Sequence, residues 1–221
     1  MGDLIPKTRD AAVTVIDENV SPGSIRSWRD IHGHFSDEDV AFMRARLGEV
    51  DYGIIVELGP FQGRSTVALA LDWLRWGNER EYWVVDDWRG GRSKDSFIRK
   101  AYDQIPEGEV RRTFDQFMEH FGLSGRVKVI QGDSAESAAR FGDGTVALCF
   151  IDADHEDEAV RRDIGAWWSK IRPGGLLCGH DFVSQDRGEI GGVTGAVLNL
   201  WKQHGIGDFR AGGSCWCVRK P

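Results

Sequence analysis

"ELGPFQGRS", residues 57–65, is the stretch that decides the fold of this chain. Residues 53–56, Gly-Ile-Ile-Val, precede it and form a short apolar run typical of a buried strand. Residues 66–74, which follow it, favour a helix. Open α/β sheets form nucleotide pockets in this way, because glycines let the backbone approach a ligand and a helix N-terminus offers unpaired N–H groups.

Two common nucleotide motifs fit this turn poorly. A P-loop needs G-x-x-x-x-G-K-[ST], but Gly59 and Gly63 are one residue too close and Arg64 stands where the lysine should be. A dinucleotide fingerprint needs G-x-G-x-x-G, and Phe61 occupies the position of its second glycine. The pattern that fits better is E-x-G-x-x-x-G, with the acid at the end of the strand.

That pattern resembles the first motif of class I S-adenosylmethionine-dependent methyltransferases, and E-L-G-x-[FY]-x-G-x-S is similar to the form found in catechol O-methyltransferases. The resemblance implies that Gly59, Phe61 and Ser65 line the pocket for the methionine portion of the cofactor. It implies cofactor-binding roles also for Glu57 and Gly63, which complete the motif.

The rest of the chain alternates between apolar strand-like runs and helical segments, which predicts a parallel sheet covered on both faces. We therefore predict a Rossmann-like class I methyltransferase fold, α/β, with a mainly parallel seven-stranded sheet and a C-terminal antiparallel hairpin. The predicted strands are Gly53–Glu57, Tyr82–Asp86, Val127–Gln131, Val146–Asp152 and Leu176–Gly179, with Phe209-Arg210 and Ser214–Arg219 as the hairpin. The predicted helices are Ser65–Arg75, Val110–Phe121, Ser134–Arg140, Glu156–Ile171 and Val193–Gln203.

Two regions are expected along the chain. Residues 1–35 are mixed and polar, and we predict an N-terminal extension that acts as a lid or as a contact in a homo-oligomer. Residues 36–221 are predicted to form a single methyltransferase domain. It opens with Ser36-Asp37-Glu38-Asp39, which resembles a capping box, and the first helix ends at Gly48.

The ends of the second and third strands carry further candidate cofactor ligands. Asp86 ends the second strand, where a carboxylate can accept both ribose hydroxyls, and Asp87 is the competing assignment. Trp88 follows them, and its ring could stack on adenine or on the acceptor. Asp133 and Ser134 lie in a G-D-S-x-E segment that resembles the adenine contact of many such enzymes, although Ser134 could equally be only a helix cap.

The most specific segment is I-D-A-D-H, residues 151–155, followed by R-P-G-G and by G-H-D-F at residues 179–182. This arrangement resembles a family of bacterial O-methyltransferases that includes the macrocin-type sugar methyltransferases. Several members are magnesium-dependent, which implies that Asp152, His180 and Asp181 hold a divalent metal here, Asp152 also lying beside the cofactor. Family members often have an acid where His180 stands, and imidazole suits Mn²⁺, Fe²⁺ or Zn²⁺ better than Mg²⁺; an orienting role for His180 is the alternative.

His155 is the predicted general base. Methyl transfer to oxygen is an in-line displacement by a weak neutral nucleophile, and histidine is the side chain whose pKa suits removal of the hydroxyl proton. In sugar-modifying relatives the histidine of D-x-x-H has this role, and residues 152–155 match that spacing. Asp154 matches the acid proposed as base in other relatives.

The bulk composition excludes several function classes. The chain has 221 residues and a formal net charge of −7, which argues against nucleic acid as a partner. It carries no apolar run of membrane-spanning length and no signal-peptide core, and its four cysteines lie in strand-like runs without C-x-x-C spacing. We expect buried thiols, no membrane partner and a cytoplasmic location.

The leading hypothesis is an S-adenosylmethionine-dependent O-methyltransferase acting on a small hydroxylated acceptor: a sugar, a polyol or a phenolic intermediate. Two other hypotheses are a P-loop-like nucleotide hydrolase that uses residues 59–66, and a non-catalytic S-adenosylmethionine-binding module. Acceptor specificity is expected from residues 1–35, 88–109 and 183–195, which carry no motif that identifies the acceptor.

Overall fold

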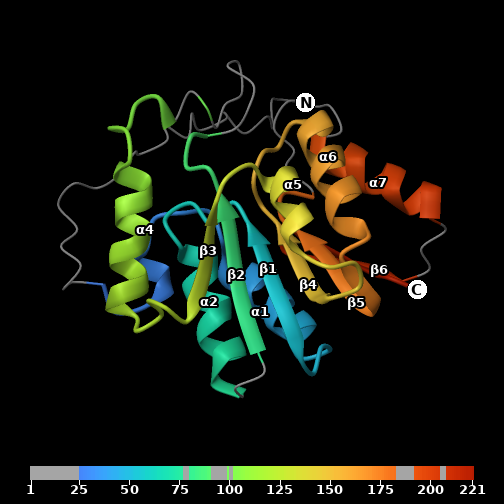
Figure 1. The fold of residues 1–221 in the computed structure, drawn as a ribbon, viewed down its shortest axis with the longest axis horizontal. Helices are drawn as coiled ribbons and strands as arrows, with labels where there is room; N and C mark the ends of the chain where they lie inside the picture. Colours follow the sequence, from blue (N-terminus) through green and yellow to red (C-terminus); the bar gives the residue numbers. More distant parts are fainter. Residues whose placement is uncertain (1–24, 77–79, 91–98, 100–101, 183–191, 205–207) are drawn as a thin grey trace, which may run out of the picture.

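The computed structural model describes residues 25–76, 80–90, 99, 102–182, 192–204 and 208–221. Its strands form one seven-stranded sheet in the order β3-β2-β1-β4-β5-β7-β6 (Figure 1). Strands β1 to β5 pair in parallel, whereas β7 is antiparallel to both β5 and β6, which confirms the predicted fold and hairpin. The strands are β1 (Gly53–Leu58), β2 (Arg80–Asp86), β3 (Val127–Gln131), β4 (Val146–Ile151), β5 (Ile171–Gly179), β6 (Phe209–Gly212) and β7 (Cys215–Arg219).

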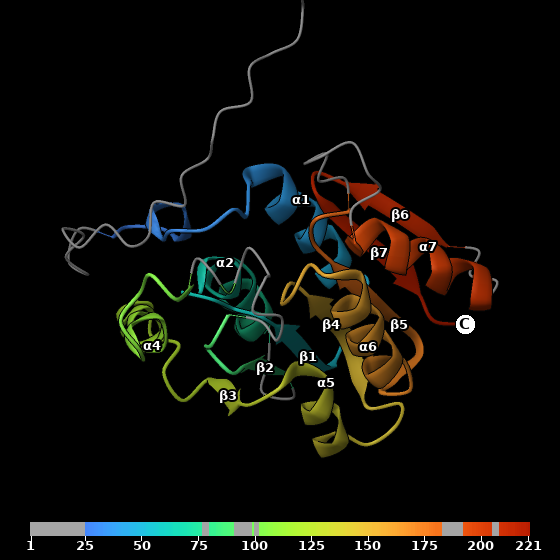
Figure 2. The ribbon, with the colours of Figure 1, turned by 90° about the horizontal axis from the view of Figure 1, so that it is seen from above.

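Helices cover both faces of the sheet (Figure 2). One buried cluster joins residues 25–50 and helices α2 and α4 to the sheet, and a second joins α6 and α7 to its other face. The near-continuous burial of β4 follows from this double cover. The helices are α1 (Asp37–Leu47), α2 (Arg64–Trp73), α4 (Glu109–His120), α5 (Ser134–Ser137), α6 (Asp157–Trp168) and α7 (Gly192–His204), with 3-10 turns η2 (Trp28–Asp30), η3 (Leu74–Trp76) and η4 (Ala138–Arg140).

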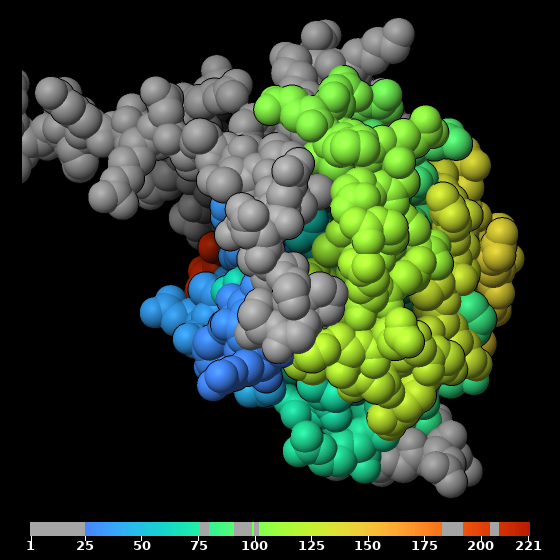
Figure 3. Space-filling model, turned by 90° about the vertical axis from the view of Figure 1, so that its left-hand side faces the viewer, coloured from blue at the N-terminus to red at the C-terminus, as the bar shows by residue number. Residues whose placement is uncertain are grey.

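Residues 25–35 pack onto the domain, beside α4 (Figure 3). Ile31 and Phe35 are buried, and the guanidinium of Arg64 donates hydrogen bonds to both of their carbonyls at 2.7 Å. This part of the predicted extension therefore lies against the start of α2. Residues 1–24 lie outside the described residues, so a lid or oligomer role for the extension stays a prediction.

The first helix begins as predicted. Ser36 accepts a hydrogen bond from the backbone N–H of Asp39, and the Asp39 carboxylate accepts one from the backbone N–H of Ser36. This capping box satisfies two of the N–H groups that a helix start leaves unpaired.

The predicted boundary between the helix over residues 156–171 and the strand that follows it is wrong. The helix predicted to run to Ile171 ends at Trp168, and Ile171 opens β5 because it pairs with Val146 of β4. Residues 173–175, Pro-Gly-Gly, lie inside β5, although proline and glycine usually interrupt a strand. The backbone of Lys220 bonds to Gly174 and Gly175, so tertiary pairing extends the strand through them.

The cysteine prediction is confirmed: all four thiols are free and buried, on β4, β5 and β7. Among the described helices, none has the length and apolar character needed to cross a membrane.

Candidate active site

The predicted site residues meet at one edge of the sheet, where the parallel strands end. Backbone hydrogen bonds join each strand end to its neighbour and fix the loops relative to one another. They run from Gly132 to Asp86 (3.0 Å), from Gly59 to Val85 (2.9 Å), from Asp152 to Leu58 (2.9 Å) and from His180 to Ile151 (3.0 Å).

Glu57 lies beneath the glycine loop and is fully buried. Its carboxylate accepts hydrogen bonds from the hydroxyls of Ser65, Thr66 (2.8 Å) and Tyr82 (2.9 Å). Burial raises the pKa of Glu57 to about 7, although the three hydrogen bonds oppose the rise. The structure thus shows Glu57 and Ser65 holding the loop from below, and their direct contact with the cofactor stays a prediction.

This buried acid makes a testable contribution to stability. The folded state binds the Glu57 proton more tightly than the unfolded chain does, so the free energy of unfolding should fall as pH rises from 4.5 to about 7. The expected fall is on the order of 3 kcal/mol. Urea unfolding at several pH values in this range measures how steeply the free energy of unfolding falls with pH. The fall should be shallower for Glu57→Gln than for wild type, and it should be unchanged for the exposed control Glu119→Gln. Equal slopes in Glu57→Gln and wild type would contradict the assignment.

The two motif glycines are required by the backbone. Gly59 has φ of +78°, and a Cβ there would lie 2.2 Å from the carbonyl oxygen of Asp152. Gly63 precedes α2 with φ of +95°, and a Cβ there would lie 2.8 Å from Met118. Phe61 between them has φ of +50°, a strained conformation for a non-glycine residue. The glycine loop therefore packs directly on the end of β4.

Asp86 and Asp87 lie at the end of β2 with different partners. A carboxylate oxygen of Asp86 accepts from the backbone N–H of Trp88 at 2.7 Å, and burial raises its pKa to about 7. Asp87 accepts from the backbone N–H of Arg89 at 2.7 Å.

Trp88, whose ring is predicted to stack on adenine or on the acceptor, is buried in the core, and its contact with either ligand stays a prediction. Trp88 is only 6% exposed, and its ring packs against Phe114 under the guanidinium of Arg111. Its indole N–H donates to the carbonyl oxygen of Phe61 at 3.0 Å, so Trp88 supports the glycine loop from within the core.

Tyr102 packs against the glycine loop, a contact that the sequence did not reveal. Its ring packs edge-on against Phe61, with centroids 5.6 Å apart, and lies where a Cβ on Gly90 would be 2.5 Å away. Burial is the largest cause of the raised pKa of Tyr102, and the charges of Asp86 and Asp87 raise this pKa further. The Tyr102 hydroxyl therefore lies in the electrostatic field of both acids. Tyr102 follows a polar stretch without a motif, which is why no local signal marked it.

Asp133 and Ser134 lie at the end of β3, where adenine binding is predicted. Asp133 caps α5 through the backbone N–H of Glu136 and pairs with Arg162. The hydroxyl of Ser134 donates to Asp163. Asp133 thus has partners at the start of α5 and on α6, and Ser134 has one on α6. The contact of both residues with adenine stays a prediction.

Four predicted residues converge at the ends of β4 and β5. Nε2 of His155 lies 3.1 Å from Oδ2 of Asp181 and 3.9 Å from Oδ1 of Asp152. Nδ1 of His180 lies 3.1 Å from the same Asp181 oxygen and 3.7 Å from the same Asp152 oxygen. Asp181 has φ of +58°, strained backbone of a kind that persists at functional sites.

The electrostatics of this cluster couple the acids to the imidazoles. Burial opposes charge on His155, but Asp152 and Asp181 outweigh it and raise the pKa of His155. Burial likewise opposes charge on His180, and the surrounding acids raise its pKa to about 11. For Asp152, burial dominates and raises the pKa, whereas the pKa of Asp181 is lowered by the two imidazoles despite its burial.

The donor set fits a divalent cation. Asp152, His155 and Asp181 can each place one ligand atom within 4.8 Å of the others, and Nδ1 of His180 borders the same two carboxylates. Two carboxylates with imidazole suit Mn²⁺ at least as well as Mg²⁺. A small pocket adjoins this cluster; its lining consists of Ile151, Asp152, Ala153, Asp154, His155, Val160, His180, Val193 and Trp216.

Asp154, the alternative base, lines the same pocket. One of its oxygens accepts from the backbone N–H of Glu156 at 3.2 Å, which directs that oxygen toward the start of α6. His155 instead has its side chain 45% exposed and faces the acids of the cluster.

A glycine loop at the end of β1, acids at the ends of β2 and β4, and the sheet order define a class I methyltransferase. The chain belongs to the methyltransferase-domain family, whose model matches residues 56–182. It is therefore an S-adenosylmethionine-dependent methyltransferase, and the nucleotide-hydrolase alternative is not favoured. Among curated proteins, none matches the sequence.

Similar solved structures show the same fold at low identity. The O-methyltransferase NovP is 18% identical, with a TM-score of 0.63 over 82% of this chain and 78% of its own. The calicheamicin methyltransferase CalS11 is 17% identical, with a TM-score of 0.59 over the same shares, 82% and 78%. A protein from Corynebacterium glutamicum is 14% identical, with a TM-score of 0.60 over 85% of this chain and 82% of its own.

Proposed function

We propose that the protein transfers a methyl group from S-adenosylmethionine to a hydroxyl of a small molecule, such as a sugar, a polyol or a phenol. The observation that carries the proposal is the cluster of Asp152, His155, His180 and Asp181 directly beside the glycine loop. Gly59 packs on the backbone of Asp152, so the donor loop and the cluster adjoin. NovP and CalS11, which are named as an O-methyltransferase and a methyltransferase, agree with methyl transfer by this fold.

In the proposed reaction, a lone pair of the acceptor oxygen attacks the sulfonium methyl carbon in line with the leaving sulfur. The bond between methyl and sulfur breaks, and its electron pair stays on sulfur, giving S-adenosylhomocysteine and a methyl ether. Nε2–H of His155 is directed at the carboxylate of Asp181, so the other ring nitrogen, Nδ1, takes the hydroxyl proton. Asp152 and Asp181 hold the His155 ring by the contacts of 3.9 and 3.1 Å and stabilise the imidazolium that forms.

A divalent metal is part of the proposal. Asp152, His180 and Asp181 would hold it, and it would lower the pKa of the acceptor hydroxyl when bound. The proposed cytoplasmic location is supported by the four free, buried cysteines.

The experiment that tests this function uses labelled S-adenosylmethionine and a panel of sugars, polyols and catechols, with and without a chelator. We expect methyl transfer to at least one hydroxyl, and loss of transfer in chelator with recovery on adding Mg²⁺ or Mn²⁺. Calorimetry should show binding of S-adenosylmethionine and none of a nucleoside triphosphate. The non-catalytic alternative predicts cofactor binding without any transfer.

Asp86 is assigned to the ribose, and a paired substitution tests that assignment. Asp86→Asn should weaken S-adenosylmethionine binding roughly 10- to 100-fold, because hydrogen bonds to a charged acceptor contribute about 1.5–3 kcal/mol. Asp87→Asn should change it little, since Asp86 ends β2 and is the assigned ribose ligand, whereas Asp87 lies one residue beyond the strand. Calorimetric titration of both variants measures the difference. The opposite order of affinities would transfer the role to Asp87.

A further inference from the structure

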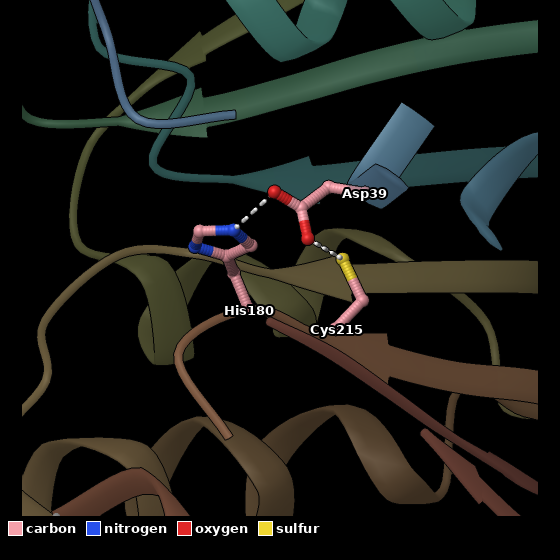
Figure 4. Close-up of side chains that lie close together, drawn as sticks. All are labelled: Asp39, His180 and Cys215. Atoms are coloured by element: carbon pink, nitrogen blue, oxygen red, sulfur yellow. Dashed lines mark hydrogen bonds and ion pairs between the residues drawn. The ribbon is translucent and has the colours of Figure 1, made fainter. Parts of the chain in front are cut away.

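Helix α1 reaches the active site through one buried carboxylate, that of Asp39 (Figure 4). Asp39 is 1% exposed, and its Oδ2 lies 3.2 Å from Nε2 of His180. His180 is 5% exposed, and among the residues that the structure describes Nε2 has this ion-pair contact with Asp39 and no hydrogen-bond partner. Its second nitrogen, Nδ1, faces Asp152 and Asp181. The imidazole ring therefore bridges α1 and the site.

Two chain segments hold the Asp39 carboxylate in place. The backbone and hydroxyl of Ser36 donate to Oδ2 at 2.8 and 2.6 Å, and the backbone of Ser214 donates to Oδ1 at 2.7 Å. Cys215 contacts Oδ1 at 3.7 Å, as Figure 4 also shows. Gly213 has φ of +59°, and a Cβ there would lie 2.4 Å from Oδ1, so the turn between β6 and β7 closes tightly on this carboxylate.

Helix capping alone does not account for this arrangement. A capping acid needs only the helix start, and such residues are stable at the surface. Burial of a carboxylate is costly unless it is paired, and His180 is the ionisable cation that Asp39 contacts within the described chain. The phenyl ring of Phe35, 5.8 Å from the imidazole centroid, packs against the same histidine. The His180 ring is thus held by the contact of Nε2 with Asp39 and by packing against Phe35.

We propose that Asp39 is a positioning residue of the active site, which orients the His180 ring. In this orientation Nε2–H faces Asp39. Nδ1 then lies beside Asp152 and Asp181, where it can bind a divalent cation together with them. Imidazole ligands in metalloproteins commonly donate their second N–H to a carboxylate, which fixes the tautomer and the ring orientation. Asp39 and Ser214 lie outside residues 56–182, so this support comes from beyond the segment that matches the family. The inference rests on the divalent metal of the proposed function.

Titration with Mn²⁺ alone, with free Mn²⁺ measured by electron paramagnetic resonance, tests the inference. Asp39→Asn should bind Mn²⁺ roughly 10- to 100-fold more weakly than wild type. The control Glu38→Gln removes the same charge from an exposed position of α1 and should leave Mn²⁺ affinity unchanged. Unchanged S-adenosylmethionine affinity in Asp39→Asn would show that the fold is retained.

A double-mutant cycle with His180→Gln separates positioning from general destabilisation. If Asp39 acts through His180, Asp39→Asn should cause no further loss of Mn²⁺ affinity in the His180→Gln background. Should Asp39→Asn fail to fold, nitrogen NMR of the wild type with diamagnetic Mg²⁺ should show a protonated Nε2 and an unprotonated Nδ1 for His180.

Three results would overturn the inference: wild-type affinity in Asp39→Asn, an equal loss in both backgrounds, or no Mn²⁺ binding by the wild type. If the wild type binds no Mn²⁺ but still transfers methyl groups in the presence of a chelator, the proposed methyl transfer is retained and only the metal site is rejected. The two failures are therefore distinguishable.

Discussion

His155→Ala is expected to lower kcat roughly 10²- to 10⁴-fold, the usual contribution of a general base. The ring faces Asp152 and Asp181, at the ends of β4 and β5, and lines the small pocket beside them. Affinity for S-adenosylmethionine should therefore stay unchanged. The measurement is a single-turnover methyl-transfer rate at saturating acceptor, paired with calorimetry. His120→Ala, on α4, is the matched histidine control and should keep the wild-type rate.

The pH profile of the same enzyme gives an independent check on His155. A base must be unprotonated, so kcat/KM should rise with pH on the acidic limb. Because Asp152 and Asp181 raise the pKa of His155, the midpoint should lie above the ordinary histidine value of 6.5. This limb should be absent in His155→Ala. A midpoint below 6.5, or an unchanged limb in the variant, would assign the proton to another group such as Asp154.

Gly59→Ala should disrupt the donor loop and the end of β4 together. The new Cβ would lie 2.2 Å from the carbonyl oxygen of Asp152, and φ of +78° is itself unfavourable for alanine. Left-handed backbone costs about 1–3 kcal/mol and overpacking about 1–3 kcal/mol, so the free energy of unfolding should fall by about 2–6 kcal/mol. Affinity for S-adenosylmethionine should fall with it.

Gly144→Ala is the control that separates these two costs. Gly144 has a similar φ of +69°, but no atom lies within 4 Å of a Cβ built there. Urea unfolding should therefore show only the conformational cost, about 1–3 kcal/mol, with normal cofactor affinity. If both alanine variants lost equal stability and both bound the cofactor normally, close packing of Gly59 on β4 would not matter to the site.

Local patterns predicted most of the fold because each has a local cause. The alternation of apolar runs and helical segments gave the strands and helices, and the capping box at Ser36 gave the start of α1. The end of α6 could not be predicted in this way. Ile171 could continue the helix by its own preference, and only pairing with Val146 makes it part of β5.

The candidate site was predictable where its residues end a strand, as Asp86 does, or follow within two residues of its end, as Asp152 and Asp181 do. The pairing of Asp39 with His180 was not, because 140 residues of sequence separate them and Asp39 already had a local explanation as a helix cap. The position of Trp88 after Asp86 favoured a ligand contact, and the tertiary packing of its ring against Phe114 could not be predicted from that position.

Transfer of a labelled methyl group to an acceptor oxygen is the most direct test of the central claim. The wild type and His155→Ala would be compared with the same hydroxylated acceptor, and the position of the label determined by NMR of the product. We expect a methyl ether from the wild type and at most a trace from His155→Ala. Label on nitrogen or carbon, or equal amounts of methyl ether from both proteins, would contradict the claim.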